Sequence, residues 1–178
     1  MEWFKTIAIT AIVFIAIRAF LFSPISVKGA SMMPNYEDGD LVLINKIGKV
    51  MHDFERFDVI VLKANESENY IKRIIGLPGD HIAYQNDLLY INGEKYDEPY
   101  LEEYKKQLND DGNLTNNFTL EEVINLTEIP EGYYFVLGDN RRVSDDSRYP
   151  SVGLISKDKI LGNVSIRYYP FDHFGLAK

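Results

Sequence analysis

The segment NYIKRIIGLPGD, residues Asn69–Asp80, has the pattern of an apolar strand followed by a tight turn. Alternation along the strand places Lys72 on the same face as Tyr70 and Ile74. The Pro-Gly pair in LPGD is typical of a type II turn. A lysine at such a position is usually solvated at a sheet edge. If its face is buried instead, desolvation lowers its pKa and makes it a usable base near neutral pH.

Short stretches rich in Val, Ile and Tyr recur on both sides of this segment, separated by turn residues. Each stretch predicts a strand, and the predicted strands are Ile25–Lys28, Leu41–Asn45, Val59–Leu62, Tyr70–Ile75, His81–Tyr84, Leu88–Ile91, Tyr133–Leu137 and Asn163–Tyr169. Asn86-Asp87 and Asn92-Gly93 suit two-residue hairpin turns, whose central residues need positive φ. Many strands at close spacing predict a mainly β fold, with an antiparallel sheet or a barrel-like domain.

Helices are expected to be few and short beyond the N-terminus. The candidates are Tyr100–Leu108 and the segment SKDKIL, where Ser156 can cap the first turn. Residues 109–117 are polar and predict a surface loop.

The N-terminus carries an apolar run, TIAITAIVFIAIRAFLF, over residues 6–22, which is interrupted only by Arg18. This length is at the short end of what a membrane-spanning helix needs. Trp3 and Phe4 resemble an aromatic belt at one end, and Pro24 is expected to stop the helix beyond the other. The pattern predicts a transmembrane anchor.

A cleaved secretory signal peptide is the alternative interpretation of this run. It would need small residues before the cleavage point, and the best candidate, VKGA ending at Ala30, has Val27-Lys28 where a small, uncharged pair is wanted. We therefore expect a short cytoplasmic N-terminus at 1–5, an anchor at 6–22 and one extracytoplasmic domain at 23–178. Lys5 and Lys28 flank the run on its two sides, so charge alone does not set the orientation.

The composition excludes several kinds of chemistry. The net charge of -8 argues against nucleic acid as a partner. The absence of cysteine excludes disulfides, thiolate metal sites and cysteine nucleophiles. His52, His81 and His173 are scattered without metal-ligand spacing. We expect neither a metal nor a cofactor.

Three segments are candidates for the chemistry. The first is VKGASMMPNY, Val27–Tyr36, in which Ser31 leaves a strand for a turn limited by proline. The second contains Lys72, and the third is GDNRRVSDDSR, Gly138–Arg148. Taken singly, they also fit an ordinary turn, an edge lysine and a charged surface loop. A Ser–His–Asp triad stays open at this point because geometry defines triads, although no GxSxG motif supports one.

Taken together and in this order, the segments resemble the conserved boxes of the bacterial type I signal peptidases. The resemblance covers nearly the whole chain and includes the anchor, the serine box, KRIIGLPGD, the hairpin NDLLYINGEKYDEPYL and GDNRxxSxDSR. The small size and single anchor resemble the Gram-positive form. The resemblance implies the signal peptidase fold and a membrane-anchored serine endopeptidase.

By this resemblance Ser31 is the nucleophile and Lys72 is its general base. Such a base is needed because a free hydroxyl is a weak nucleophile, and lysine can serve only when it is neutral. Ser144 matches the serine that orients the lysine amine. The Ser31 N–H matches one donor of the oxyanion hole.

The resemblance also implies structural ion pairs of Asp146 with Arg73 and Arg148. Two positions depart from the family pattern. Gly29 stands where many relatives have a hydroxyl residue that supplies a second oxyanion donor. Asn35 stands where the usual residue is Thr, which leaves the geometry of the serine turn open.

A substrate is expected to lie extended between the Ser31 and Lys72 strands and to add main-chain hydrogen bonds. Shallow apolar pockets would select small residues, as in A-x-A before signal cleavage sites, and their candidate residues are Ile25, Val27, Met32, Tyr70 and Ile71. The expected partners are preprotein signal peptides and the lipid bilayer, near the secretion translocon. Signal peptides cross outward before cleavage, so the domain is expected outside a single-pass anchor whose N-terminus is cytoplasmic.

Two rivals remain. A self-cleaving repressor with a Ser–Lys dyad would carry a DNA-binding domain and no membrane segment, and this chain shows the reverse. A non-catalytic, signal-peptidase-like membrane protein could assist surface-protein or pilus assembly. The presence of both Ser31 and Lys72 argues against it.

Overall fold

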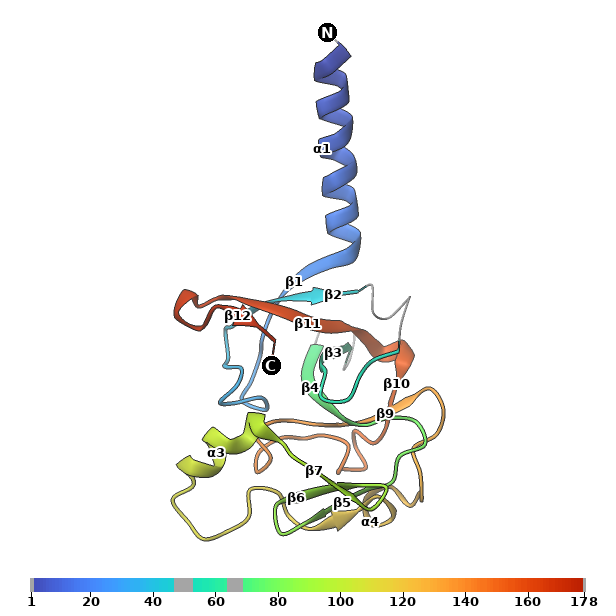
Figure 1. Ribbon diagram of the computed structural model, residues 1–178, viewed down its shortest axis with the longest axis vertical. Helices are drawn as coiled ribbons and strands as arrows, with labels where there is room; N and C mark the ends of the chain where they lie inside the picture. Colours follow the sequence, from blue (N-terminus) through green and yellow to red (C-terminus); the bar gives the residue numbers. More distant parts are fainter. Residues whose placement is uncertain (1, 47–52, 64–68, 178) are drawn as a thin grey trace.

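Two antiparallel sheets form the fold, with the N-terminal helix standing out from one end (Figure 1). The computed structural model describes residues 2–46, 53–63 and 69–177. The larger sheet has the strand order β1-β2-β11-β3-β4-β9-β10, with β12 paired to β11. Its strands are β1 Phe22–Ser26, β2 Leu41–Asn45, β3 Val59–Lys63, β4 Asn69–Gly76, β9 Tyr133–Leu137, β10 Ile155–Ser156, β11 Ile160–Tyr169 and β12 Gly175–Leu176.

The smaller sheet lies at the end of the molecule away from α1 (Figure 1). Its strand order is β7-β6-β5-β8, and its strands are β5 Ile82–Gln85, β6 Leu88–Ile91, β7 Glu94–Tyr96 and β8 Phe118–Thr119. The helices and 3-10 turns are α1 Glu2–Leu21, η1 Pro99–Leu101, α3 Glu102–Gln107, α4 Leu120–Ile124, η2 Lys157–Lys159 and η3 Phe171–His173.

The mainly antiparallel β architecture confirms the predicted fold class. The strands β2, β6 and β9 have the bounds that the sequence predicts. The first strand differs: β1 is Phe22–Ser26, earlier than the expected Ile25–Lys28. Helix α1 already ends at Leu21, and Phe22 pairs directly with Asn45 of β2. Pro24 therefore lies inside an edge strand, where its missing N–H costs no ladder bond.

The predicted turns take the required backbone conformations. Asn86 and Asp87, between β5 and β6, have φ of 52° and 61°. Asn92 and Gly93, between β6 and β7, have φ of 53° and 84°. Two consecutive positive φ angles match the twist of the paired strands, which is why short polar residues occupy these positions. These turns fix the register of the smaller sheet.

The polar segment 109–117 is free of helix and strand, as expected, and the predicted helix at Tyr100–Leu108 is present as η1 followed by α3. After Ser156 the chain forms only the 3-10 turn η2, and the serine side chain makes no capping bond. Helix α4 was not predicted. It begins at a capping box between Thr119 and Glu122.

Three apolar clusters fill the described part of the molecule. One lies under the smaller sheet and includes Phe135 of β9, so it joins the two sheets. A second packs Ile60 and Ile74 on one face of the larger sheet. The third packs Met32 and Ile71 together, and so attaches the turn after β1 to strand β4.

Helix α1 leads directly into β1 and covers most of the predicted anchor. Its residues 3–15 are exposed. Among the residues that the structure describes, no helix combines the length and the apolar character needed to cross a membrane.

Candidate active site

Lys72 lies in β4 opposite Ile60 of β3 and is only 3% exposed. Its Nζ donates a hydrogen bond of 3.1 Å to Ser144 Oγ, and Ser144 is itself buried. Burial lowers the pKa of the Lys72 ammonium to about 8, against the attraction of Asp146 and Asp145, which acts to raise it. The side chain is therefore held in place, and its neutral form is far more populated near pH 7 than that of a free lysine.

Ser31 lies in the turn between β1 and β2. Main-chain bonds between Val27 and the segment Gly39-Asp40 close the base of this turn, with lengths of 2.8 and 3.0 Å. Met32, buried in the cluster with Ile71, holds the turn against β4. Gly29 has a φ of +80°, which a side chain there would strain.

The Ser31 N–H has no hydrogen-bond partner among the described residues. A free backbone N–H beside a nucleophile is the donor that an oxyanion hole needs. Gly29 contributes no side-chain donor, and its own N–H is bonded to Asp38 Oδ1 at 2.7 Å.

Asn140 attaches the loop after β9 to the serine turn. Its N–H donates to the Ser31 carbonyl at 3.0 Å, and its Nδ2 donates to the Ala30 carbonyl at 3.0 Å. One residue thus fixes two consecutive peptide groups of the turn.

Gly138 shows how closely the three predicted segments approach one another. A Cβ at this position would overlap both Ser144 Oγ and the Ser31 carbonyl oxygen. The Ser31 carbonyl and the Ser144 hydroxyl, which binds Lys72, therefore both pack against the α-carbon of Gly138, where there is no room for a side chain. Within the described residues no hydrogen bond joins Ser31 Oγ to Lys72 Nζ. Catalytic hydrogen bonds are often unformed in the absence of substrate.

Asp146 and Arg148 form the expected ion pair. Arg148 Nε and Nη2 bond to the two carboxylate oxygens at 2.8 and 2.9 Å. Asp146 Oδ2 also accepts from the Gly138 N–H at 3.1 Å. The pair shapes the loop around Ser144.

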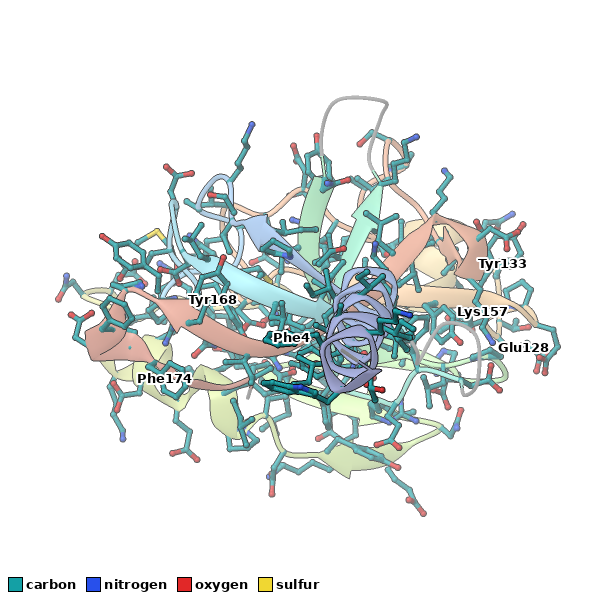
Figure 2. All side chains as sticks on the ribbon, turned by 90° about the horizontal axis from the view of Figure 1, so that it is seen from above. Phe4, Glu128, Tyr133, Lys157, Tyr168 and Phe174 are labelled. Carbon is teal, nitrogen blue, oxygen red and sulfur yellow. The ribbon has the colours of Figure 1, made fainter. Side chains whose placement is uncertain are left out.

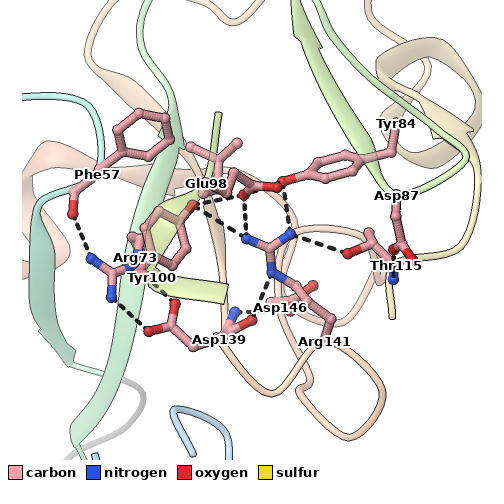
Figure 3. A network of polar contacts seen from close by, with 12 residues as sticks. Phe57, Arg73, Tyr84, Asp87, Glu98, Tyr100, Thr115, Asp139, Arg141 and Asp146 are labelled. Atoms are coloured by element: carbon pink, nitrogen blue, oxygen red, sulfur yellow. Dashed lines mark hydrogen bonds and ion pairs between the residues drawn. The ribbon is translucent and has the colours of Figure 1, made fainter. Parts of the chain in front are cut away.

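The partner of Arg73 differs from the expected Asp146. Its Nε and Nη2 bond to the two oxygens of Asp139, at 2.8 and 2.6 Å, and both side chains are fully buried (Figure 3). The reason is register: Arg73 lies opposite Leu137 at the end of β9, so the loop brings Asp139 to the guanidinium first. Asp146, on the returning limb, bonds instead to Gly138 and Arg148.

A second buried network joins this loop to the smaller sheet (Figure 3). Arg141 Nη2 bonds to Glu98 Oε1 at 2.6 Å, and the hydroxyls of Tyr84 and Tyr100 donate to the same oxygen, each at 2.7 Å. Burial acts to raise the pKa of Glu98, but Arg141 and these hydrogen bonds hold it below its usual range. Each of the four side chains in this network therefore has a hydrogen-bond partner within it.

Four of the five expected substrate-binding residues belong to one apolar cluster, and Tyr70 is outside that cluster. Val27, Met32 and Ile71 are buried in one apolar cluster, and Ile25 packs against it. Tyr70 is 40% exposed, and its ring centroid is 5.8 Å from Lys72 Nζ. The three buried side chains can form only the floor of a pocket.

The histidines lie elsewhere. His81 Nε2 contacts Glu121 Oε2 at 2.9 Å beside the smaller sheet, and His173 lies on η3. His52 lies outside the described residues. Of the described histidines, neither is hydrogen-bonded to Ser31. Among the described side chains, no group of three or more His, Cys, Asp or Glu is placed to hold a metal ion.

Gly138, Asp139 and Asn140 lie in the third candidate segment, but no role was predicted for them from the sequence. Their contacts depend on how the loop folds back, which residue order alone does not give. The only indication in the sequence of this loop was the run of turn-forming residues Gly, Asp and Asn at its start.

Comparisons with known proteins agree on one family. A family model described as signal peptidase, peptidase S26, matches residues 1–169. A signal peptidase I of Bacillus caldolyticus is 50% identical over 172 residues, covering 97% of this chain and 91% of the relative. A signal peptidase IB of Staphylococcus aureus strain Mu50 is 42% identical over 178 residues, covering 98% and 92%. The crystal structure of a signal peptidase I from Enterococcus faecalis V583 matches with a TM-score of 0.59 and 40% identity, covering 64% of this chain and 97% of that one.

Proposed function

Because the chain belongs to the signal peptidase family of peptidase S26 and, as a signal peptidase I, removes signal peptides from preproteins, we propose that Ser31 and Lys72 carry out the cleavage as nucleophile and general base. The observation that carries this proposal is the buried Lys72 amine, bonded to Ser144 at 3.1 Å, with its pKa lowered to about 8.

The proposed reaction begins when Ser31 Oγ attacks the scissile carbonyl carbon and passes its proton to neutral Lys72. The Ser31 N–H stabilises the oxyanion of the tetrahedral intermediate. The Lys72 ammonium then returns the proton to the leaving amine of the mature protein, which leaves the signal peptide as an ester on Ser31. Water, deprotonated by Lys72, attacks the ester carbonyl, and the Lys72 ammonium then returns this proton to Ser31 Oγ as it leaves, which frees the signal peptide and restores the dyad.

Ser144 is proposed to act through Lys72. Its buried hydroxyl accepts from Nζ and fixes the direction of the amine, which has several rotatable bonds in its stem. The ion pair of Asp146 with Arg148 supports the loop that carries Ser144.

The substrate is proposed to add as a strand beside β4. Strand β9 pairs with β4 only from Arg73 onward, so the edge of residues 69–72 facing away from β3 has no partner among the described strands. An extended peptide there would form main-chain bonds and pass the turn of Ser31. Val27, Met32 and Ile71 are buried in one apolar cluster, and we propose that a shallow pocket over this cluster selects the small residues of A-x-A.

Helix α1 is proposed to anchor the chain in the bilayer, with its N-terminus cytoplasmic, the β domain outside and the site near the translocon. The support for this proposal is the apolar run of residues 6–22, whose length is at the short end of what a membrane span needs. An apolar groove of about 650 Å³ continues from Phe14 and Ile15 of α1 onto Tyr168 and Phe174. Figure 2 shows both on the same side of the helix, with Tyr168 on β11 and Phe174 farther out toward the edge of the molecule.

The proposal is tested by removing each member of the dyad. Ser31→Ala and Lys72→Ala should each lower kcat on a model preprotein by at least about a thousandfold, because residues that act as one unit fail together. Circular dichroism should show both variants folded. Near-normal turnover in a folded Lys72→Ala variant would refute the assignment of the base.

A further inference from the structure

Asn35 ends the serine turn and uses both hydrogens of its side-chain amide on groups outside that turn. Its Nδ2 donates to Asp139 Oδ2 at 2.8 Å and to the Tyr100 carbonyl at 2.9 Å. Its own carbonyl accepts from Arg167 Nη1 of β11 at 2.7 Å. The residue is therefore fixed through its side chain and its main chain by three separate elements.

The contact with Asp139 leads directly to the strand of the base. Asp139 is fully buried, and its two oxygens also receive the bidentate bonds from Arg73, the residue after Lys72 in β4. The Arg73 guanidinium lies 3.9 Å from the centroid of the Tyr100 ring (Figure 3). The Asn35 amide thus binds Asp139 and Tyr100, and both of these residues also contact Arg73.

The two ends of the serine turn are attached to consecutive residues of the same loop. Asn140 holds the carbonyls of Ala30 and Ser31 at one end, and Asp139 holds Asn35 at the other. Removing the second attachment would leave the Asn35 end held through its main chain by Arg167, and no longer tied to the loop that binds Arg73. That end of the turn could then shift, and Ser31 would move relative to Lys72.

We propose that Asn35 is a positioning residue, whose amide sets the distance between the Ser31 turn and the Lys72 strand by bridging Asp139 and Tyr100. The inference rests on the proposed Ser31–Lys72 dyad. It accounts for an amide at this position, where the usual residue of the resembling enzymes has a hydroxyl.

The chemistry of the bridge requires an amide. A threonine hydroxyl has one hydrogen and can satisfy only one of the two acceptors. An aspartate would keep the shape but donate to neither, and would place a second carboxylate against Asp139. Exchanging the two groups, with aspartate at 35 and asparagine at 139, would restore one donor between them and keep the net charge, although Arg73 would lose one of its two bonds to residue 139.

The experiment measures kcat and KM of the full-length chain in detergent micelles on a peptide that spans a signal cleavage site. Small displacements of reacting groups cost up to about a hundredfold in rate. Asn35→Asp should therefore lower kcat by about 30- to 100-fold, and Asn35→Thr by about three- to tenfold. KM should stay within about twofold, because the substrate is proposed to pair with residues 69–72 of β4, whereas Asn35 acts on the distance between the reacting groups. The double variant Asn35→Asp/Asp139→Asn should have a higher kcat than either single variant.

Asn117→Asp, an exposed amide-to-acid change beside the smaller sheet, is the matched control and should keep kcat. Thermal unfolding of each variant shows that the assay temperature lies below its Tm. If Asn35→Asp does not fold, the kcat of Asn35→Thr tests the inference instead. A folded Asn35→Thr with wild-type kcat, or a loss confined to KM, would overturn the inference. Ser31→Ala assayed alongside separates the two proposals, since activity in that variant would reject the dyad itself.

Discussion

Lys72 is almost out of contact with water, and this burial is why the pKa of its ammonium falls to about 8. With such a pKa, about one lysine in ten is neutral at pH 7, compared with about one in two thousand for a free lysine. The same burial costs stability. The unfolded chain binds more protons between pH about 8 and 10.4, so the free energy of unfolding rises with pH across this window.

Gly138 sets how close Ser144 and the serine turn can lie. Gly138→Ala would push its Cβ into Ser144 Oγ and the Ser31 carbonyl, neither of which can move without breaking contacts with Lys72 and Asn140. We expect kcat to fall by about a hundredfold or more, since misplacement of reacting groups is costly. The measurement is kcat on a cleavage-site peptide.

Gly112→Ala is a control for this variant. Its Cβ would meet only side-chain atoms of Asp110 and Arg142 in an exposed loop, which can move aside. Equal kcat values for Gly138→Ala and wild type would show that the close approach at Gly138 has no part in catalysis.

For single residues, the side chains that carry the chemistry could be predicted from the sequence, whereas the partners that they contact could be predicted only in part. The structure places Lys72 and Ser144 in contact, as the resemblance implies, and pairs Asp146 with Arg148. The partner of Arg73 was not predictable, because Gly138–Arg148 contains three aspartates and only the path of the loop selects Asp139.

At the scale of elements, the sequence predicts best where a strand is long enough to show its pattern. Strands of four or more residues were found, whereas β7, β8, β10 and β12 have two or three residues and too little alternation to recognise. Helix α4 did carry a signal, since Thr119 and Glu122 have the spacing of a capping box.

Helix α1 can be separated from the β domain at a defined point. The Leu21 carbonyl accepts from the Lys46 N–H at 2.9 Å, and β1 starts at Phe22, so removal of residues 1–20 keeps this bond and the whole pairing of β1 with β2. We expect kcat/KM on a short peptide to stay within about threefold. Cleavage of a preprotein embedded in vesicles should fall by about a hundredfold, because the local concentration is lost.

Removal of residues 1–26 is the comparison for this truncation. It deletes β1 and exposes β2, so peptide cleavage should also be lost. If deletion of 1–20 lowered both substrates equally, α1 would be part of the catalytic fold and the proposed anchor would be wrong.

For the whole molecule, the buried pair of Arg141 and Glu98 joins the catalytic loop to the smaller sheet. Glu98→Gln leaves the Arg141 charge buried without a counter-charge, so we expect a loss of about 3–5 kcal/mol in the free energy of unfolding. Asp97→Asn, at the neighbouring exposed pair with Lys95, should change it by less than about 1 kcal/mol. Urea denaturation at pH 7 measures both, and equal values for the two variants would reject a linking role for the network.

A neutral lysine as the base gives a pH dependence of kcat/KM that a histidine base would not give. The profile of kcat/KM reports the pKa of the catalytic base in the enzyme without bound substrate. Asp139, Asp145, Asp146 and Arg148 are the charged groups that act on Lys72, and Asp145 is the exposed acid among them.

We predict that activity rises with pH through a limb near the Lys72 pKa of about 8. Asp145→Asn should move the limb down by a few tenths of a unit, at about the strength of a partly screened charge. Tyr70→Glu, which adds a carboxylate at an exposed position beside the amine, should move it up, and Glu94→Gln on β7 should leave it in place. A wild-type limb near 6.5, typical of a histidine and unmoved by all three changes, would contradict the Ser–Lys mechanism.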